Sequence, residues 1–152
     1  MMKEFNSVND ILDFAMGQEQ GAVDFYTQIA GYARNAEMKK IFLDFAQEEV
    51  GHKARLQKIK EEQIFVISAE KIADLKISDY TDNVVASPDM KYDEALILAM
   101  KREKAAFRLY SNLAASIGDA NMKNLFLSLA QEESKHKLRF ELEYDDYVLR
   151  EN

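Results

Sequence analysis

The chain has 152 residues, 47% of them apolar, which is enough for one domain with a hydrophobic core. Its formal charge of −7 argues against sequence-independent binding to nucleic acid or to an anionic membrane, because both need a basic surface. The chain has no cysteine, which excludes disulfides, thiolate zinc sites and iron–sulfur centres. Any bound metal must therefore be held through nitrogen and oxygen.

The composition favours helices over strands. One proline and five glycines leave few breakers, and good helix formers are plentiful. We expect an all-α fold in a single domain that spans residues 1–152. No segment resembles a signal peptide or a bilayer-spanning helix, so we expect a cytoplasmic protein with no membrane or nucleic acid among its partners.

The first helix is expected to begin near Val8. Ser7 is a good N-cap, and the acidic Asp10 three residues later resembles a capping box. Apolar residues then recur at spacings of three and four as far as Ala30. Glu19 falls in the middle of this apolar stripe, so its carboxylate is expected to face the core.

The second helix follows after a short link, residues 31–35, and Asn35 is its expected N-cap. A short link between long helices makes them antiparallel neighbours. Glu49 and His52 both interrupt the apolar stripe of this helix. Two more polar groups are therefore expected to point inward.

A long crossover is expected over about residues 63–87, where the helical pattern weakens. It contains one short helix around 69–75. A connection of this length can return along a whole helix of about 25 residues, which is roughly 37 Å long. The second and third long helices should then run parallel.

The third helix is expected to start at Ser87 and Pro88, an N-cap followed by a proline in the first turn. Gly118 should follow its end, and Asp119 should cap the fourth helix. Glu103 lies in the middle of the third helix's apolar stripe. In this helix too, a carboxylate is expected to face the core.

The fourth helix carries Glu133 and His136 within its apolar stripe. Its acidic, tyrosine-rich tail, residues 141–152, is expected to extend the helix, and it contains no recognisable motif.

An internal duplication relates the two halves. Shifting the chain by 84 residues places 15–56 on 99–140 without a gap, and 18 of the 42 positions are identical. Two helical hairpins related in this way can pack as a four-helix bundle around a pseudo-twofold axis. The matched pairs are Glu19 with Glu103, Tyr26 with Tyr110, Glu49 with Glu133 and His52 with His136.

The only two histidines of the chain each lie three residues after a glutamate. On a helix, residues three apart share a face, so each Glu-x-x-His can chelate a metal. Four buried glutamates need a counter-charge, and two divalent cations would supply it. With two imidazoles added, the set suits iron, manganese, cobalt or zinc better than calcium or magnesium. The predicted ligands are Glu19, Glu49, His52, Glu103, Glu133 and His136.

These motifs resemble the rubrerythrin branch of the ferritin-like di-iron carboxylate proteins. The resemblance extends from the first long helix to the fourth. It implies a ferritin-like four-helix bundle whose six ligands hold two iron ions, with manganese or zinc as alternatives. It also implies that the metal centre reduces peroxide or reacts with dioxygen. It further implies that the hydroxyls of Tyr26 and Tyr110 bond ligand carboxylates from another helix.

Two departures from the family pattern change the expectations. Full-length rubrerythrins carry a rubredoxin domain with four cysteines, which this chain lacks, so electrons must come from an external donor such as a rubredoxin or a flavoprotein reductase. Rubrerythrins also carry an extra glutamate near the third-helix ligand, where this chain has Ala99, Met100, Ala106 and Phe107. We therefore expect both histidines to stay bound when the metals change oxidation state.

Three functions remain open at this point. The chain is expected to be an enzyme, a di-iron oxidoreductase acting on peroxide or dioxygen. The alternatives are a ferroxidase that handles iron, and a structural helical module with an empty or zinc-filled site. The resemblance also predicts a homodimer, with or without helices exchanged between chains.

Simpler interpretations exist for individual residues. Glu49 with Lys53, and Glu133 with Lys137, have the spacing of surface ion pairs, but the duplication and the apolar surroundings favour metal ligands. A second repeated set is expected to form only a solvated face because it is offset from the ligand stripe: Glu48, Glu132, Arg55 and Arg139.

Overall fold

The structure, a computed structural model, describes residues 4–63, 66–81, 87 and 89–151. In that part of the chain every regular element is a helix, which confirms the all-α prediction. The elements are α1 (Val8–Ala30), α2 (Ala36–Glu62), α3 (Ala69–Asp74), the 3-10 helix η1 (Ile77–Asp79), α4 (Tyr92–Ser116) and α5 (Ala120–Glu151).

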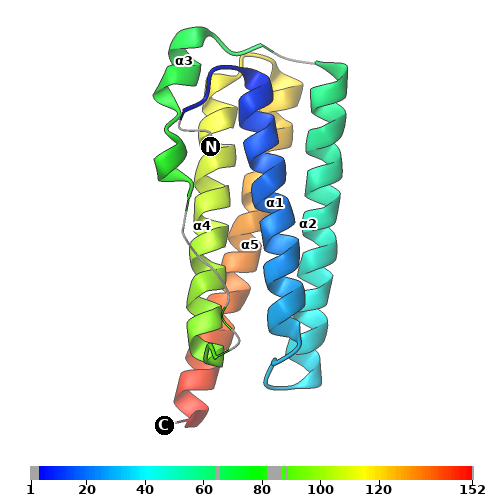
Figure 1. Cartoon of the computed structure of the whole chain (residues 1–152), viewed down its shortest axis with the longest axis vertical. Helices are drawn as coiled ribbons and strands as arrows, with labels where there is room; N and C mark the ends of the chain where they lie inside the picture. The colour runs from blue at the N-terminus through cyan, green and yellow to red at the C-terminus, as the bar shows by residue number, and fades with distance from the viewer. Residues whose placement is uncertain (1–3, 64–65, 82–86, 88, 152) are drawn as a thin grey trace.

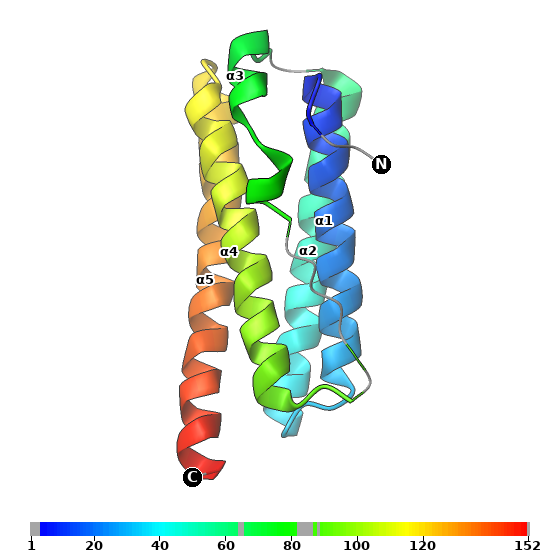
Figure 2. The same ribbon diagram turned by 60° about the vertical axis from the view of Figure 1, so that its left-hand side comes forward.

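The four long helices form an elongated bundle of two antiparallel hairpins (Figure 1). One hairpin pairs α1 with α2, the other pairs α4 with α5, and α1 also packs against α4. The crossover carries α3 at the end of the bundle where α2 stops and η1 farther along α4, and α4 begins at the opposite end (Figure 2). As a result α2 and α4 run in the same direction, as predicted. Within the described residues, no helix combines the length and apolar character needed to cross a membrane.

Side-chain caps define the starts of three of the four long helices. Ser7 Oγ, Asn35 Oδ1 and Asp119 Oδ2 each accept a hydrogen bond from the backbone amide three residues later, at 3.1, 2.8 and 3.1 Å. These bonds satisfy amides that have no partner inside the first turn of a helix. The predicted starts of α1, α2 and α5 are confirmed.

The predicted start of α4 at Ser87 is wrong, because this helix begins at Tyr92. Ser87 Oγ accepts a hydrogen bond from Asp89 N at 3.2 Å, and its carbonyl accepts one from Met90 N at 3.0 Å. This pattern closes a turn instead of starting a helix. Pro88, the predicted first residue of the helix, lies outside the described residues.

The hydrophobic core is divided into two clusters along the bundle. One cluster, near α3, includes Ile11, Leu56, Leu113 and Phe126, and the other, toward the opposite end, includes Phe25, Ile29, Phe42, Leu96 and Phe140. On each of the four long helices a buried polar residue separates the two apolar stretches. The polar layer therefore lies between two apolar clusters that keep water away from it.

An ion pair between a partly exposed arginine and a buried glutamate closes the bundle at the end opposite α3. Glu143 in the extended α5 is almost fully buried and receives two hydrogen bonds from Arg34, in the α1–α2 link, at 2.7 and 2.9 Å. Tyr92, at the start of α4, donates a third at 2.8 Å. The predicted extension of the last helix is confirmed, and its tail joins three parts of the chain.

We expect Arg34→Ala to lower the free energy of unfolding by about 3 kcal/mol, because it leaves the Glu143 carboxylate buried without a counter-charge. Urea unfolding followed by circular dichroism measures the change. Lys40→Ala is the matched control, because Lys40 and its partner Asp44 are both exposed. Equal effects of the two substitutions would contradict the structural role given to Glu143.

Candidate metal centre

All six predicted ligands meet in the middle of the bundle. Each is 1–3% exposed. The helix α1 supplies one glutamate and α4 another, while α2 and α5 each supply a glutamate and a histidine one turn apart. In order along the chain they are Glu19, Glu49, His52, Glu103, Glu133 and His136.

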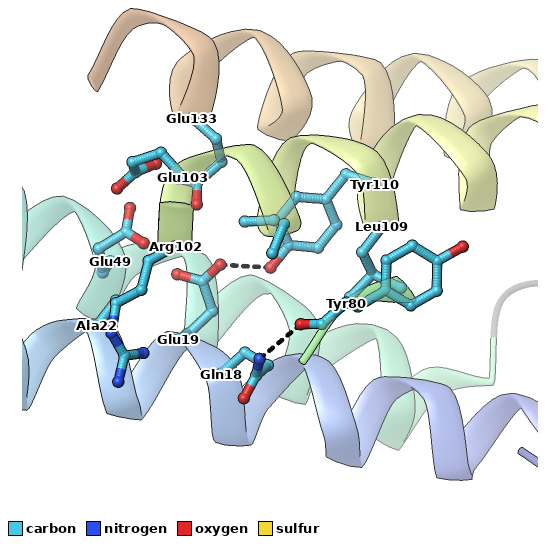
Figure 3. Close-up of a pocket in the computed structure, with 12 residues that line it drawn as sticks. Gln18, Glu19, Ala22, Glu49, Tyr80, Arg102, Glu103, Leu109, Tyr110 and Glu133 are labelled. Atoms are coloured by element: carbon cyan, nitrogen blue, oxygen red, sulfur yellow. Dashed lines mark hydrogen bonds between the residues drawn. The ribbon is translucent and has the colours of Figure 1, made fainter. Parts of the chain in front are cut away.

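The six side chains form two overlapping groups of four. One group joins Glu19 and His52 to Glu49 and Glu133, and the other joins Glu103 and His136 to the same two glutamates. In each group the four potential ligand atoms lie within 4.8 Å of one another. Figure 3 shows the carboxylates of the four glutamates converging from different helices. The arrangement offers two adjacent cation positions with Glu49 and Glu133 shared between them.

Each of the six residues has one buried polar atom without a hydrogen-bond partner in the described structure. Buried polar atoms are normally paired, so six such atoms in one place need a physical explanation. Two divalent cations would supply the missing partners, and their charge would balance the four carboxylates. The residues present therefore fit a two-metal centre. The atoms are Glu19 Oε2, Glu49 Oε1, His52 Nδ1, Glu103 Oε2, Glu133 Oε1 and His136 Nδ1.

The pKa values of the site residues also indicate that the site favours bound positive charge. Burial, followed by repulsion from the neighbouring carboxylates, raises the pKa values of Glu49 and Glu133 well above their usual range. Burial alone would lower the pKa of His52, but the adjacent carboxylates, with Glu19 contributing most, raise it to about 9. The centre thus attracts protons or metal cations, and metal binding has to displace protons.

The outer nitrogen of each histidine contacts a glutamate from the opposite hairpin. His52 Nε2 lies 2.6 Å from Glu132 Oε2, and His136 Nε2 lies 3.1 Å from Glu48 Oε2. A carboxylate at Nε2 favours the tautomer with its proton there, which leaves the Nδ1 lone pair directed toward the centre.

The expectation that Glu48 and Glu132 form only a solvated face is therefore wrong. Their side chains are 50% and 34% exposed, yet each reaches a buried histidine. A glutamate one residue before a ligand lies at the flank of its helix, where it can contact the facing helix. One sequence signal pointed to this role, since both glutamates are retained in the repeat together with the ligands.

Two tyrosines also bond across the hairpins. The hydroxyl of Tyr26 in α1 donates to Glu103 in α4, and the hydroxyl of Tyr110 in α4 donates to Glu19 in α1. Burial and the nearby carboxylates raise the pKa of both phenols well above the usual value, so they stay protonated donors. Each bond fixes one carboxylate oxygen and leaves the other facing the centre.

Comparison with known proteins gives the family. The rubrerythrin family model matches residues 10–144. The chain belongs to the rubrerythrin family. A search of curated proteins finds no match.

A solved structure supports the fold. It is a crystal structure at 2.30 Å resolution from Thermotoga maritima, named as a ferritin-like diiron-carboxylate protein. The TM-score is 0.77 at 19% sequence identity, and the match covers 97% of this chain and 99% of the other. At this identity the likeness shows a shared fold, and it confirms the predicted ferritin-like bundle.

In this rubrerythrin-family chain a small cavity of about 20 Å³ lies beside the four glutamates, between α1 and α4. This is room for about one water-sized molecule. Ala22, Arg102 and Tyr110 line it (Figure 3), and so does Ala106. Ala106 is one of the positions considered for the additional family glutamate, and its small side chain leaves space open next to the candidate centre.

We expect Glu132→Ala to weaken metal binding by roughly 10- to 100-fold, because it removes the acceptor that orients His52. Anaerobic titration of the metal-free protein with Co(II), followed by absorption spectroscopy, measures the affinity. Glu61→Ala is the control, since Glu61 is an exposed glutamate that binds Gln57. Unchanged Co(II) affinity in Glu132→Ala would contradict the orienting role.

Proposed function

We propose that the chain is a non-haem di-iron oxidoreductase that reduces peroxide with electrons from an external donor. One observation carries the proposal: six buried polar atoms without hydrogen-bond partners among the described residues converge in two groups that share Glu49 and Glu133. Membership of the rubrerythrin family supports iron as the metal. The same nitrogen and oxygen donors could hold manganese or zinc, so the choice of iron rests on the family.

The four glutamates and two histidines would hold a pair of iron ions, which would supply the redox chemistry for a two-electron reduction of peroxide. Reduction of one hydrogen peroxide to two waters consumes two electrons and two protons. The hydrogen bonds of Tyr26, Tyr110 and the two histidines fix the positions of these candidate ligands. The apolar clusters on both sides keep bulk water out.

The cavity supports a small oxidant as substrate. Its volume of about 20 Å³, room for about one water-sized molecule, is far below that of a typical organic ligand site and leaves space only for a very small molecule. The buried phenols of Tyr26 and Tyr110 keep their protons, so they act as hydrogen-bond donors to the ligand carboxylates. The 152 residues contain no cysteine and so hold no rubredoxin-type centre, and in this proposal a separate electron donor restores the metals.

We expect hydrogen peroxide to oxidise the Fe(II)-loaded protein faster than an equal concentration of dioxygen does. Parallel anaerobic stopped-flow mixing, followed by the rise of ferric absorption, measures both rates. We also expect repeated turnover only when a reduced rubredoxin or a flavoprotein reductase is present. Free Fe(II) at the same concentration is the control.

Other outcomes of the stopped-flow comparison would indicate a different function. Much faster oxidation by dioxygen would favour a ferroxidase or an oxygenase. Failure of both oxidants would reject redox chemistry and favour a structural metal site.

A further inference from the structure

The outward side of α4 carries a row of basic side chains, which we call the α4 basic face: Lys101, Lys104 and Arg108. All three are exposed, and spacings of three and four place them on one side of the helix. With Asp79 and Ala105 they line an open hollow of about 190 Å³. The hollow thus has three cationic groups and a single acidic one.

The three cations of the α4 basic face form no ion pair within the described part of the molecule. Three surface lysines elsewhere pair with carboxylates, namely Lys40, Lys60 and Lys137, at 2.8, 2.6 and 2.6 Å. Among the described residues, no ion pair involves any of the three cations of the α4 basic face. Their charges are therefore available to a partner.

The internal repeat shows that folding does not require these cations. The equivalent positions of α1 are Gly17, Gln20 and Asp24, none of which is basic. Both helices nevertheless place a glutamate in the same buried layer. The basic face is thus a local feature of one half, in a chain whose net charge is −7.

The α4 basic face lies directly outside the candidate metal centre. Glu103 falls between Lys101 and Lys104 in the sequence, but its side chain is on the buried side of the same helix. Ala105 lines both the outer hollow and the inner cavity. A single helix, about 10 Å across, therefore separates the face from the metal ligands. Ile97, 36% exposed and one turn before Lys101, adds an apolar contact to the same row.

We propose that the α4 basic face is the docking surface for a small acidic protein that carries single electrons. This proposal rests on the proposed function, which requires an external reductant. An acidic partner is repelled by most of an acidic surface and attracted to this face, so it arrives with its redox group next to α4. For each hydrogen peroxide reduced to two waters with two protons, two donor molecules each lose one electron in successive encounters.

The test compares two triple variants with the same change in net charge. One replaces the α4 basic face, Lys101→Gln with Lys104→Gln and Arg108→Gln. The control replaces three exposed lysines on α2 and α5, Lys39→Gln with Lys58→Gln and Lys123→Gln. The probe is a chemically reduced rubredoxin of net negative charge, mixed with each iron-loaded, oxidised protein in a stopped-flow instrument over a range of chloride concentrations.

We expect the α4 triple variant to accept electrons about 10-fold or more slowly than wild type at low salt, with a weaker salt dependence. The control variant should stay within about 2-fold of wild type, since its changes lie away from the docking surface. The proposal would be overturned if the α4 triple variant accepted electrons as fast as wild type, or if both variants were slowed equally. Slowing of the wild type by phosphate but not by chloride at equal ionic strength would assign the face to a small anion and also overturn it.

A second measurement separates this proposal from the proposed function. Zinc-substituted rubredoxin carries no electron, so its binding to each protein at low salt, measured by calorimetry, reports docking alone. We expect the α4 triple variant to bind it about 10-fold more weakly than wild type does. Peroxide oxidation of the Fe(II)-loaded variant should match wild type. No binding of zinc rubredoxin to the wild type would reject the docking surface even if peroxide chemistry is present.

Discussion

The electrostatic cost of four buried glutamates is the constraint on which the rest of this structure depends. Each carboxylate loses hydration in the bundle, and all four lie close enough to repel one another. Burial raises the pKa values of Glu49 and Glu133, so the chain alone takes up protons where it lacks a metal. The bundle is therefore built around a demand for positive charge, which two divalent cations would meet without protonation.

The polar bonds around the centre also hold the two hairpins together. Four side-chain hydrogen bonds cross from one hairpin to the other, two between α1 and α4 and two between α2 and α5. The ligand layer consequently acts as the contact between the halves, and the pseudo-twofold repeat places a matching bond on each side. The pairs are Tyr26 with Glu103, Tyr110 with Glu19, His52 with Glu132 and His136 with Glu48.

Most of the helices and the six candidate ligands could be predicted from the sequence, because their signals are local or occur twice in the chain. A glutamate inside an apolar stripe, such as Glu19, is expected to face the core. The same pattern recurs 84 residues later at Glu103, which strengthens the prediction. Ser7 and Asn35 cap helices through contacts only three residues long. The start of α4 could not be predicted in this way, because Ser87 closes a turn as readily as it caps a helix.

Periodicity alone did not predict two of the interactions between distant segments. Glu143 reads as one of many acidic residues in an exposed tail, and its partner Arg34 lies 109 positions away. Glu132 is likewise ambiguous until the facing helix is placed, because a residue at the flank of a stripe can point to solvent or to a neighbour. Such pairs depend on how helices cross, which periodicity does not determine.

The central claim is that Glu49 and Glu133 are shared by two metals in one centre. Anaerobic titration with Fe(II), followed by removal of free metal and elemental analysis of wild type and Glu49→Ala, tests it most directly. The account predicts two ions per chain in the wild type and loss of both together in the variant, because one missing carboxylate opens both positions. Less than one ion in the wild type, or one ion retained in Glu49→Ala, would contradict it.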